Sequence, residues 1–254
     1  MITERVEDNI LILTLTDGKT NSIDLDTLKQ IDVAIGKVND QEEIKGIVLT
    51  GEGKFFSSGF DLPMFLGFKD IDEAIDFFNQ EEDILVNYFM CKKPVVCAMN
   101  GHSAAAGMIF AMASDYRIVA DHPKIKLGMS EIKIGLPLSI AQSQIMRFGL
   151  DTDKKFRDIM YFGNMYSPEQ SKELGLVDEI VSLDNLLARA KEIVSLWIDT
   201  PNRPFIRLKE VLKKEFSEKI KKSLKEENWQ PEMACFFEKD VRDILAFVQS
   251  GLER

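Results

Sequence analysis

Three short segments of the chain carry the residues best suited to chemistry. Residues 55–61 read FFSSGFD, residues 103–107 read SAAAG, and residues 128–135 read GMSEIKIG. Consecutive small side chains allow a ligand to approach the backbone closely, and a helix that begins at such a turn directs free N–H groups toward one point. Glu131 stands among apolar residues, where desolvation would raise its pKa toward that of a useful base. The functional interpretation of these segments is that backbone amides point into a cleft and that Glu131 serves as a base.

Each segment taken alone also has a structural interpretation. Gly59 among small polar residues is typical of a turn, and the alanines suit tight helix packing equally well. A lone glutamate is most often a surface charge, and Lys126 or Lys133 would pair with Glu131 harmlessly. The spacing within one segment does not separate these interpretations.

The elements that must position these segments alternate between buried strands and amphipathic helices. Strands are expected where apolar, β-rich residues run together: ILILTLT in a hairpin over 2–16, IVLT at 47–50, PVVCAM at 94–99, YRIVA at 116–120 and KIKLGM at 124–129. Apolar residues at helical spacing predict helices that begin at Asp24 or Asp26, near residue 71 and after the small-residue run. Ser167-Pro168-Glu169-Gln170 is a capping box. The recurrence of strand, strand and helix predicts a layered α/β core.

The composition of the chain changes at residues 199–204 (DTPNRP). Residues 1–198 are expected to form the core with the site that the three segments build, and residues 199–254 a helical oligomerisation segment. The first helix of this segment carries one apolar stripe: Leu208, Val211, Leu212, Phe216, Ile220 and Leu224. The segment cannot bury this stripe alone, so it must pack on the core or on another subunit. The lysines of residues 213–225 are expected to form mainly a solvated face.

Composition excludes several classes of function. A net charge of −10 argues against a nucleic-acid surface, and no apolar run approaches the roughly 20 residues of a membrane span. The N-terminus lacks the pattern of a signal peptide. Three cysteines at unhelpful spacings predict reduced thiols and a cytoplasmic protein. Two histidines outside any Cys/His cluster argue against a metal site.

Taken together, the three segments resemble the crotonase (enoyl-CoA hydratase/isomerase) superfamily. The resemblance extends from the first hairpin to about residue 200 and is carried by FFSSGFDL, KPVVCAMNG with its small-residue turn, ASDYRIVAD and GMSEIKIGLP. It implies an α/β fold of the crotonase (ClpP/crotonase-like) type, a spiral of repeated ββα units with a C-terminal helical segment. It also implies an acyl-CoA substrate whose coenzyme A is part of the thioester, no separate cofactor, and a homotrimer or homohexamer.

The resemblance assigns roles to individual positions. The backbone amides of Phe60 and Ala106 correspond to the two donors that hold the thioester oxygen, and Glu131 corresponds to a catalytic glutamate. The neighbouring positions are expected to bind substrate: Ser57, Ser58, Gly59, Asp61, Gly107 and Ile109.

The resemblance also favours one reaction. Family hydratases use a second glutamate, and Ile109 stands at its position here. Hydration needs water to be activated and a proton delivered, whereas one carboxylate is enough to move a proton from C2 to C4. The chain therefore looks most like a Δ3-Δ2-enoyl-CoA isomerase, while dienoyl isomerases carry a further acid where Ser139 stands. Hydration, thioester hydrolysis and a non-catalytic acyl-CoA-binding subunit are the alternatives.

Overall fold

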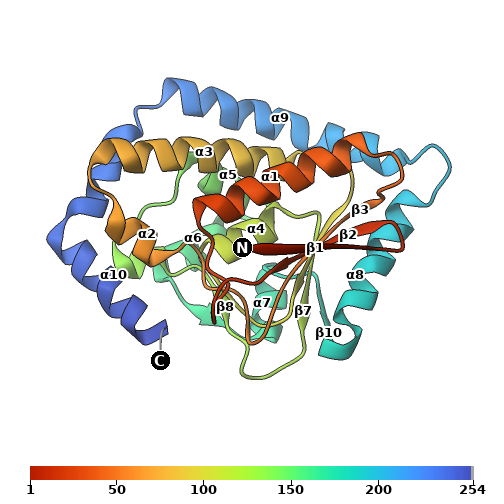
Figure 1. The fold of residues 1–254 in the computed structure, drawn as a ribbon, viewed down its shortest axis with the longest axis horizontal. Coiled ribbons are helices and arrows are strands. Elements are labelled where there is room, and N and C mark those ends of the chain that lie inside the picture. The colour runs from red at the N-terminus through yellow and green to blue at the C-terminus, as the bar shows by residue number, and fades with distance from the viewer. Residues whose placement is uncertain (253–254) are drawn as a thin grey trace.

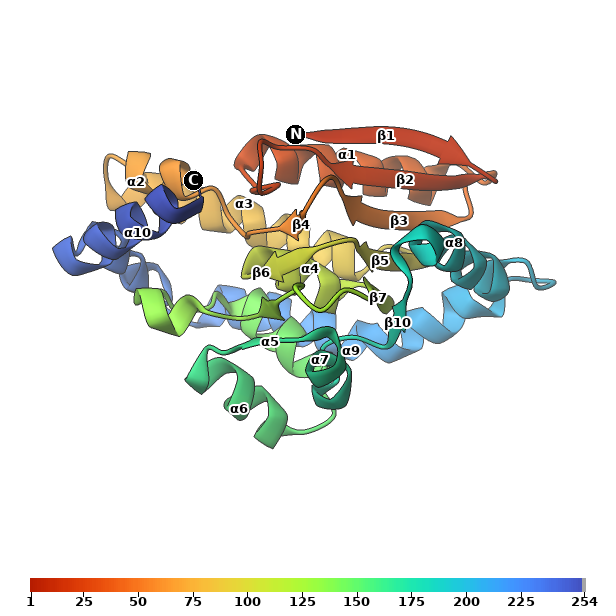
Figure 2. The same cartoon turned by 90° about the horizontal axis from the view of Figure 1, so that it is seen from below.

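The computed structural model describes residues 1–252. Its larger sheet has six strands, and Figures 1 and 2 show how the helices surround it. These strands are, in spatial order, β1 (Ile2–Glu7), β2 (Ile10–Leu15), β3 (Gly46–Gly51), β5 (Val95–Met99), β7 (Tyr116–Ala120) and β10 (Glu179–Val181). β1 pairs antiparallel with β2, as the predicted hairpin requires, and all other neighbours are parallel. β2, β3 and β5 are buried almost throughout, which explains their continuous apolar runs.

A second, smaller sheet holds the ends of the site segments. Its strands are, in spatial order, β4 (Phe55–Ser57), β6 (His102–Ala104), β8 (Leu127–Gly128) and β9 (Met165–Tyr166). Along the chain, β3 of the larger sheet leads to β4 of the smaller one, β5 leads to β6, and β7 leads to β8. Helical segments follow each of these pairs. This repetition confirms the predicted spiral of ββα units. The expected strand at 124–129 is wrong in extent, because only Leu127 and Gly128 pair with neighbours.

Helices surround both sheets. They are α1 (Leu25–Asp40), α2 (Leu62–Gly67), α3 (Ile71–Phe89), α4 (Ala106–Ala113), α5 (Ile140–Phe148), α6 (Asp153–Phe162), α7 (Pro168–Leu174), α8 (Leu183–Ile198), α9 (Pro204–Glu226) and α10 (Lys239–Leu252), with 3₁₀ turns η1 (Glu131–Ile134) and η2 (Gln230–Phe237). α4 is buried along its whole length, which agrees with its lack of charge. No helix among residues 1–252 has the length and apolar character needed to cross a bilayer.

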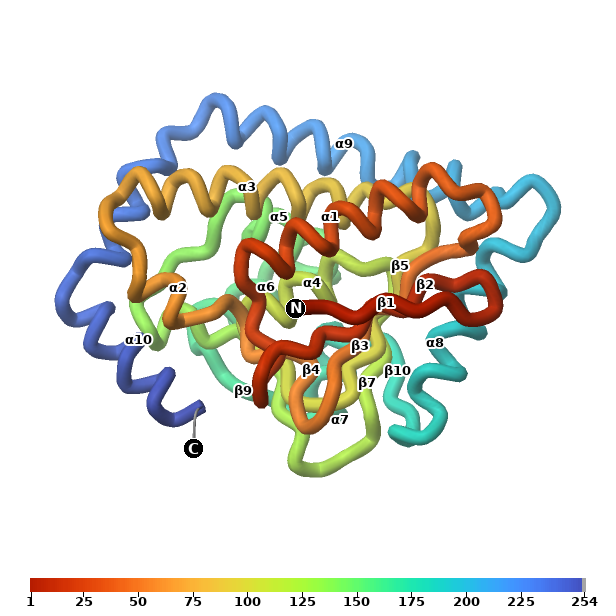
Figure 3. Tube along the Cα trace, viewed as in Figure 1, coloured from red at the N-terminus to blue at the C-terminus, as the bar shows by residue number. Residues whose placement is uncertain are grey.

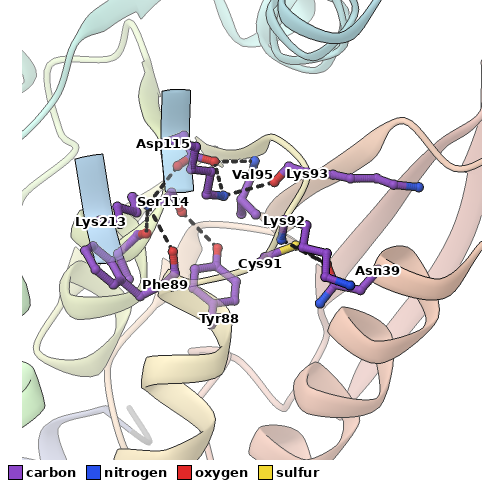
Figure 4. Close-up of polar contacts among 12 residues, drawn as sticks. Asn39, Tyr88, Phe89, Cys91, Lys92, Lys93, Val95, Ser114, Asp115 and Lys213 are labelled. Carbon is purple, nitrogen blue, oxygen red and sulfur yellow. Dashed lines mark hydrogen bonds and ion pairs between the residues drawn. The ribbon is translucent and has the colours of Figure 1, made fainter. Parts of the chain in front are cut away.

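Helix α9 faces the core with two lysines as well as with part of its predicted apolar stripe. Lys209 and Lys213 are buried and form ion pairs of 2.6 and 2.7 Å with Asp115, at the end of α4. Figure 4 shows Asp115 between Lys213 and the amide of Val95, which donates to Asp115 over 2.8 Å. The expectation of solvated lysines is therefore wrong for Lys213. The stripe itself divides: Ile220 is buried, Phe216 and Leu224 contact the core, and Leu208, Val211 and Leu212 are exposed.

The last part of the chain returns to the first third of the molecule. In Figures 2 and 3 the blue α10 lies beside α2, and the two helices are in contact. η2 packs against α3, with Phe236 of η2 against Phe65 and Phe78. Residues 199–252 thus pack against the core of their own chain. The sequence left open whether this segment packs on the core or on another subunit, and the structure shows that part of it packs on the core.

Candidate active site

Among residues 1–252, the amide of Phe60 is left free by the way its loop is anchored. Ile23 donates to the carbonyl of Gly59 over 2.9 Å and accepts from the amide of Asp61 over 3.0 Å. In this parallel bridge the N–H of Phe60 points away from Ile23. The bridge therefore holds the loop after β4 while the Phe60 amide remains available to a ligand.

The amide of Ala106 is free for a different reason. Ala106 is the first residue of α4, so its N–H has no acceptor within the helix. Ala105 before it has φ of 51° and ψ of −126°, a conformation that costs a non-glycine residue free energy. This turn joins β6 to the helix within two residues and directs the helix N-terminus toward the loop after β4.

Two glycines allow these two segments to meet. A Cβ atom on Gly59, which has φ of 106°, would lie 2.6 Å from the Cβ of Ala105 and 3.3 Å from the nitrogen of Ala106. A Cβ atom on Gly107 would lie 2.8 Å from that of Ser57. Larger residues would push the segments apart, so the small side chains are required for the close approach of the Phe60 and Ala106 amides.

Glu131 begins η1 and lies at the edge of a cavity of about 290 Å³. Burial raises the pKa of its carboxyl group to about 7, although the backbone amides of Glu131 and Ser130 counter part of this rise. Its Oε2 atom is buried without a hydrogen-bond partner in the described part of the chain. Within residues 1–252 no ion pair joins Glu131 to Lys126 or Lys133. The structure therefore does not support the interpretation of Glu131 as a paired surface charge.

The cavity brings the predicted segments together. Ser58, Phe60, Ala105, Ile109 and Glu131 all line it. The rest of the wall is mainly apolar: Leu62, Phe65, Phe78, Ile134, Leu136, Pro137, Phe236, Val248 and Leu252, with Ser130, Lys133 and Gln142 as its further polar residues. An apolar cavity that contains one carboxyl group of raised pKa, with free backbone amides beside it, suits a thioester with a hydrocarbon chain.

The remaining predicted residues support these segments. Ser57 accepts a hydrogen bond from the amide of Gly59 over 3.1 Å, and Asp61 caps α2 by accepting from the amide of Met64 over 3.0 Å. Neither these two residues nor Gly59, Ala106 and Gly107 are among those that line the cavity. The structure gives Ser57 and Asp61 positioning roles, and their contact with substrate stays a prediction.

Sequence reasoning missed the part of the wall that comes from distant elements. Phe236, Val248 and Leu252 belong to η2 and α10, which the sequence assigned to oligomerisation. Gln142 lies in the stretch after Glu131, and sequence reasoning assigned no role to this residue. Its place three residues after Ser139 marks a capping box, but no local signal shows that this residue lines the cavity.

Comparison with known proteins identifies the family of the chain. The family model described as enoyl-CoA hydratase/isomerase matches residues 5–247. The chain belongs to the enoyl-CoA hydratase/isomerase family. Within this family it is 25% identical over 208 residues to mouse mitochondrial enoyl-CoA delta isomerase 1, covering 81% of this chain and 71% of the mouse protein. It is equally 25% identical over 195 residues to a probable enoyl-CoA hydratase from Mycobacterium tuberculosis H37Rv, covering 76% of this chain and 72% of that protein.

The fold of the family is matched over almost the whole chain. The crystal structure of human mitochondrial delta3-delta2-enoyl-CoA isomerase superposes with a TM-score of 0.90 at 18% identity and covers 99% of this chain and 98% of that chain. An enoyl-CoA hydratase/isomerase from Mycobacterium paratuberculosis superposes with a TM-score of 0.83 at 22% identity, with 97% of each chain covered. The crotonase fold is therefore confirmed, including its C-terminal helices.

Proposed function

We propose that this family member moves the double bond of a 3-enoyl-CoA thioester to the 2-position. The observation that carries the proposal is the content of the cavity wall. Among the described residues that line it, Glu131 supplies the sole carboxylate, and Ile109 stands where a second acid would serve hydration. The similarity to the mouse delta isomerase supports the same reaction.

The proposed reaction needs one base and one oxyanion site. The Glu131 carboxylate takes a proton from C2, and the released electron pair is delocalised to the thioester oxygen as a dienolate. The N–H groups of Phe60 and Ala106 donate to this oxygen, and one such donor stabilises a transition state by roughly 3 kcal/mol. The Glu131 carboxyl group then returns the proton at C4, so the double bond moves from C3–C4 to C2–C3 with no net change in composition.

Exclusion of water favours isomerisation over hydration. The Ile109 side chain neither binds nor activates water, and Val248 and Leu252 of α10 add apolar surface to the same cavity. A base with a pKa of about 7 is also matched to proton transfer near neutral pH.

We further propose the setting in which the reaction occurs. Coenzyme A enters only as part of the substrate, in fatty-acid or related acyl-CoA degradation, and no separate cofactor takes part. The free thiols of Cys91, Cys97 and Cys235 support a reducing, cytoplasmic location. Assembly as a homotrimer or homohexamer is supported by the exposed apolar residues of α9.

The deciding experiment compares two rates in the wild-type protein. We expect 3-enoyl-CoA to be isomerised faster than 2-enoyl-CoA is hydrated. The kcat/KM for isomerisation should fall as pH decreases through about 7, because the base becomes protonated. Glu131→Gln should lower turnover by about 10²–10⁴-fold, whereas Glu173→Gln, an exposed site on α7, should leave it unchanged.

Each rival function has its own signature in the same assays. Faster hydration of 2-enoyl-CoA would show that the replacement of the second acid by Ile109 does not prevent hydration. Release of free coenzyme A thiol would identify a hydrolase. Binding without any turnover that depends on Glu131 would identify a non-catalytic acyl-CoA-binding subunit.

A further inference from the structure

The two proposed donor amides share an unusual feature, a positive φ at the residue before them. Gly59 precedes the Phe60 amide and has φ of 106°. Ala105 precedes the Ala106 amide and has φ of 51° with ψ of −126°, which lies outside the left-handed helical region. Glycine adopts such angles readily, whereas a Cβ atom makes them unfavourable. Ala105 is therefore strained where a glycine would not be, and it lines the cavity.

Hydrogen bonds on both sides hold Ala105 in this conformation. Its N–H donates to the carbonyl of Gly128 over 3.3 Å, and its carbonyl accepts from the amide of Ile109 over 3.0 Å. Ala104, the residue before it, pairs with Gly128 in the smaller sheet. Backbone strain persists only where the surrounding structure imposes it, and it concentrates at functional sites.

The methyl group of Ala105 reaches the loop that carries the other donor. A Cβ atom placed on Gly59 would be 2.6 Å from the Cβ of Ala105, and a Cβ atom is one bond length from its Cα. The Ala105 methyl group therefore contacts the Cα of Gly59. The peptide that carries the Phe60 N–H begins at Gly59, and the peptide that carries the Ala106 N–H begins at Ala105. This contact limits how closely the two donor peptides approach each other.

Core packing does not account for the Ala105 methyl group. Ala105 is half-buried and is not part of the hydrophobic core formed by the described residues. A glycine at this position would relieve the strain and remove only a partly exposed methyl group. Folding stability alone would therefore favour glycine at position 105.

We propose that Ala105 is a positioning residue whose methyl group is a spacer between the two oxyanion donors. The methyl group sets the separation of the Phe60 and Ala106 N–H groups so that both converge on an enolate oxygen. Without it the turn relaxes and the two donors lose this alignment, which weakens binding of the charged enolate more than binding of the neutral thioester. The inference rests on the proposed function only in placing the thioester oxygen at these two amides.

A 3-ketoacyl-CoA tests the spacer without turnover. Loss of the C2 proton from this ester, with Glu131 as the base, gives an enolate whose charge is shared by the thioester oxygen. The enolate absorbs at longer wavelength than the neutral ester, so the absorbance of the complex measures the ratio of bound enolate to bound neutral ester. Calorimetry with a saturated acyl-CoA of the same chain length measures binding of a thioester that forms no such enolate.

Ala105→Gly removes the methyl group and relieves the strain. We expect the enolate ratio to fall about tenfold, part of the roughly 10²–10³-fold loss in rate that follows removal of one oxyanion donor. The affinity for the saturated ester should stay close to that of the wild type. The melting temperature should rise by about 2–4 °C, because the strained conformation is unstrained for glycine.

Two further variants separate the spacer from general damage. Ala105→Ser keeps the Cβ atom and should keep at least the wild-type enolate ratio, with the wild-type melting temperature. Ala111→Gly makes the glycine substitution on α4 at a buried residue that does not line the cavity. It should lower the melting temperature, because glycine is unfavourable within a helix, and leave the enolate ratio unchanged.

Four results would overturn the inference. An unchanged enolate ratio in Ala105→Gly shows that the methyl group sets no separation, and a lower melting temperature of this variant shows that the turn is not strained. A fall in the ratio for Ala105→Ser as well shows that the Cβ atom is not responsible. A wild type that binds no enolate shows that the two amides hold no anionic oxygen. Faster hydration than isomerisation, by contrast, overturns the proposed function and leaves this binding test in force.

Discussion

Glu131 illustrates how a catalytic property is obtained at the expense of folding stability. Its buried carboxyl group has a pKa of about 7 instead of 4.5, and burial is the main cause. Between these two values the folded state retains a proton that the unfolded state has released. The folded state therefore loses stability as pH rises through this window, with no further change above pH 7.

Replacement of Glu131 should reverse this loss. Because glutamine does not ionise, Glu131→Gln should raise the free energy of unfolding at pH 8 by up to about 3 kcal/mol, at 1.36 kcal/mol for each pKa unit. The gain should shrink as pH is lowered toward 4.5. Urea unfolding at pH 5 and pH 8 provides the measurement. A variant that is less stable than wild type at pH 8, or a difference that is the same at both values, would contradict this account of Glu131.

Helix α9 is anchored by charge where its sequence suggested apolar packing. Asp115 pairs with Lys209 and Lys213, and these two lysines hold the pKa of Asp115 below its usual value against the opposing effect of burial. Burial lowers the pKa of Lys213 to about 8, although Asp115 counteracts this effect. Two buried lysines thus depend on one carboxylate.

Loss of Asp115 should therefore destabilise the molecule more than loss of one lysine. Asp115→Asn leaves both lysines without a counter-charge and should lower the free energy of unfolding by about 3–5 kcal/mol. Lys213→Met should cost less, since Lys209 still neutralises Asp115. Lys214→Met, at an exposed neighbour, should stay within about 0.5 kcal/mol of wild type. Chemical denaturation ranks the three variants, and equal effects for the Asp115 and Lys213 variants would disprove the shared counter-charge.

The whole molecule exposes apolar residues on the outer side of α9. Leu208, Val211 and Leu212 are 68%, 62% and 65% exposed, and α9 lies at the edge of the molecule in Figure 1. These three residues form the α9 patch. The chain's own core does not cover this patch, so burial in an oligomer is the expected use of it.

We accordingly expect a trimer, or a hexamer of two trimers, in solution. Leu212→Glu should shift the assembly toward smaller species, because it places a charge within the α9 patch. Lys214→Glu introduces the same side chain on the same helix outside the patch and should not change the mass. Light scattering measures all three proteins. A monomeric wild type rejects the oligomer, and an unchanged mass for Leu212→Glu removes the α9 patch from the interface.

The sequence determined the features whose signals are local. The capping box at Ser167, the apolar strands β3 and β5, and the start of α1, which the sequence placed at Asp24 or Asp26, each follow from a few adjacent residues. The site segments were also recognisable, since small residues before a helix and a glutamate among apolar residues keep their meaning wherever the chain goes. The structure places Ser58, Phe60, Ile109 and Glu131 around one cavity, while their roles in binding and catalysis stay predictions.

Only the tertiary structure decided which faces meet. Periodicity shows that α9 has an apolar stripe, but its orientation depends on Asp115, which lies 94 positions from Lys209 in the chain. The part that α10 takes in the cavity wall and the meeting of Glu81 with Gln142 depend in the same way on residues far apart in sequence. A sequence pattern describes what a surface can bury, whereas the free energy of burial is set by the partner that the fold brings to it.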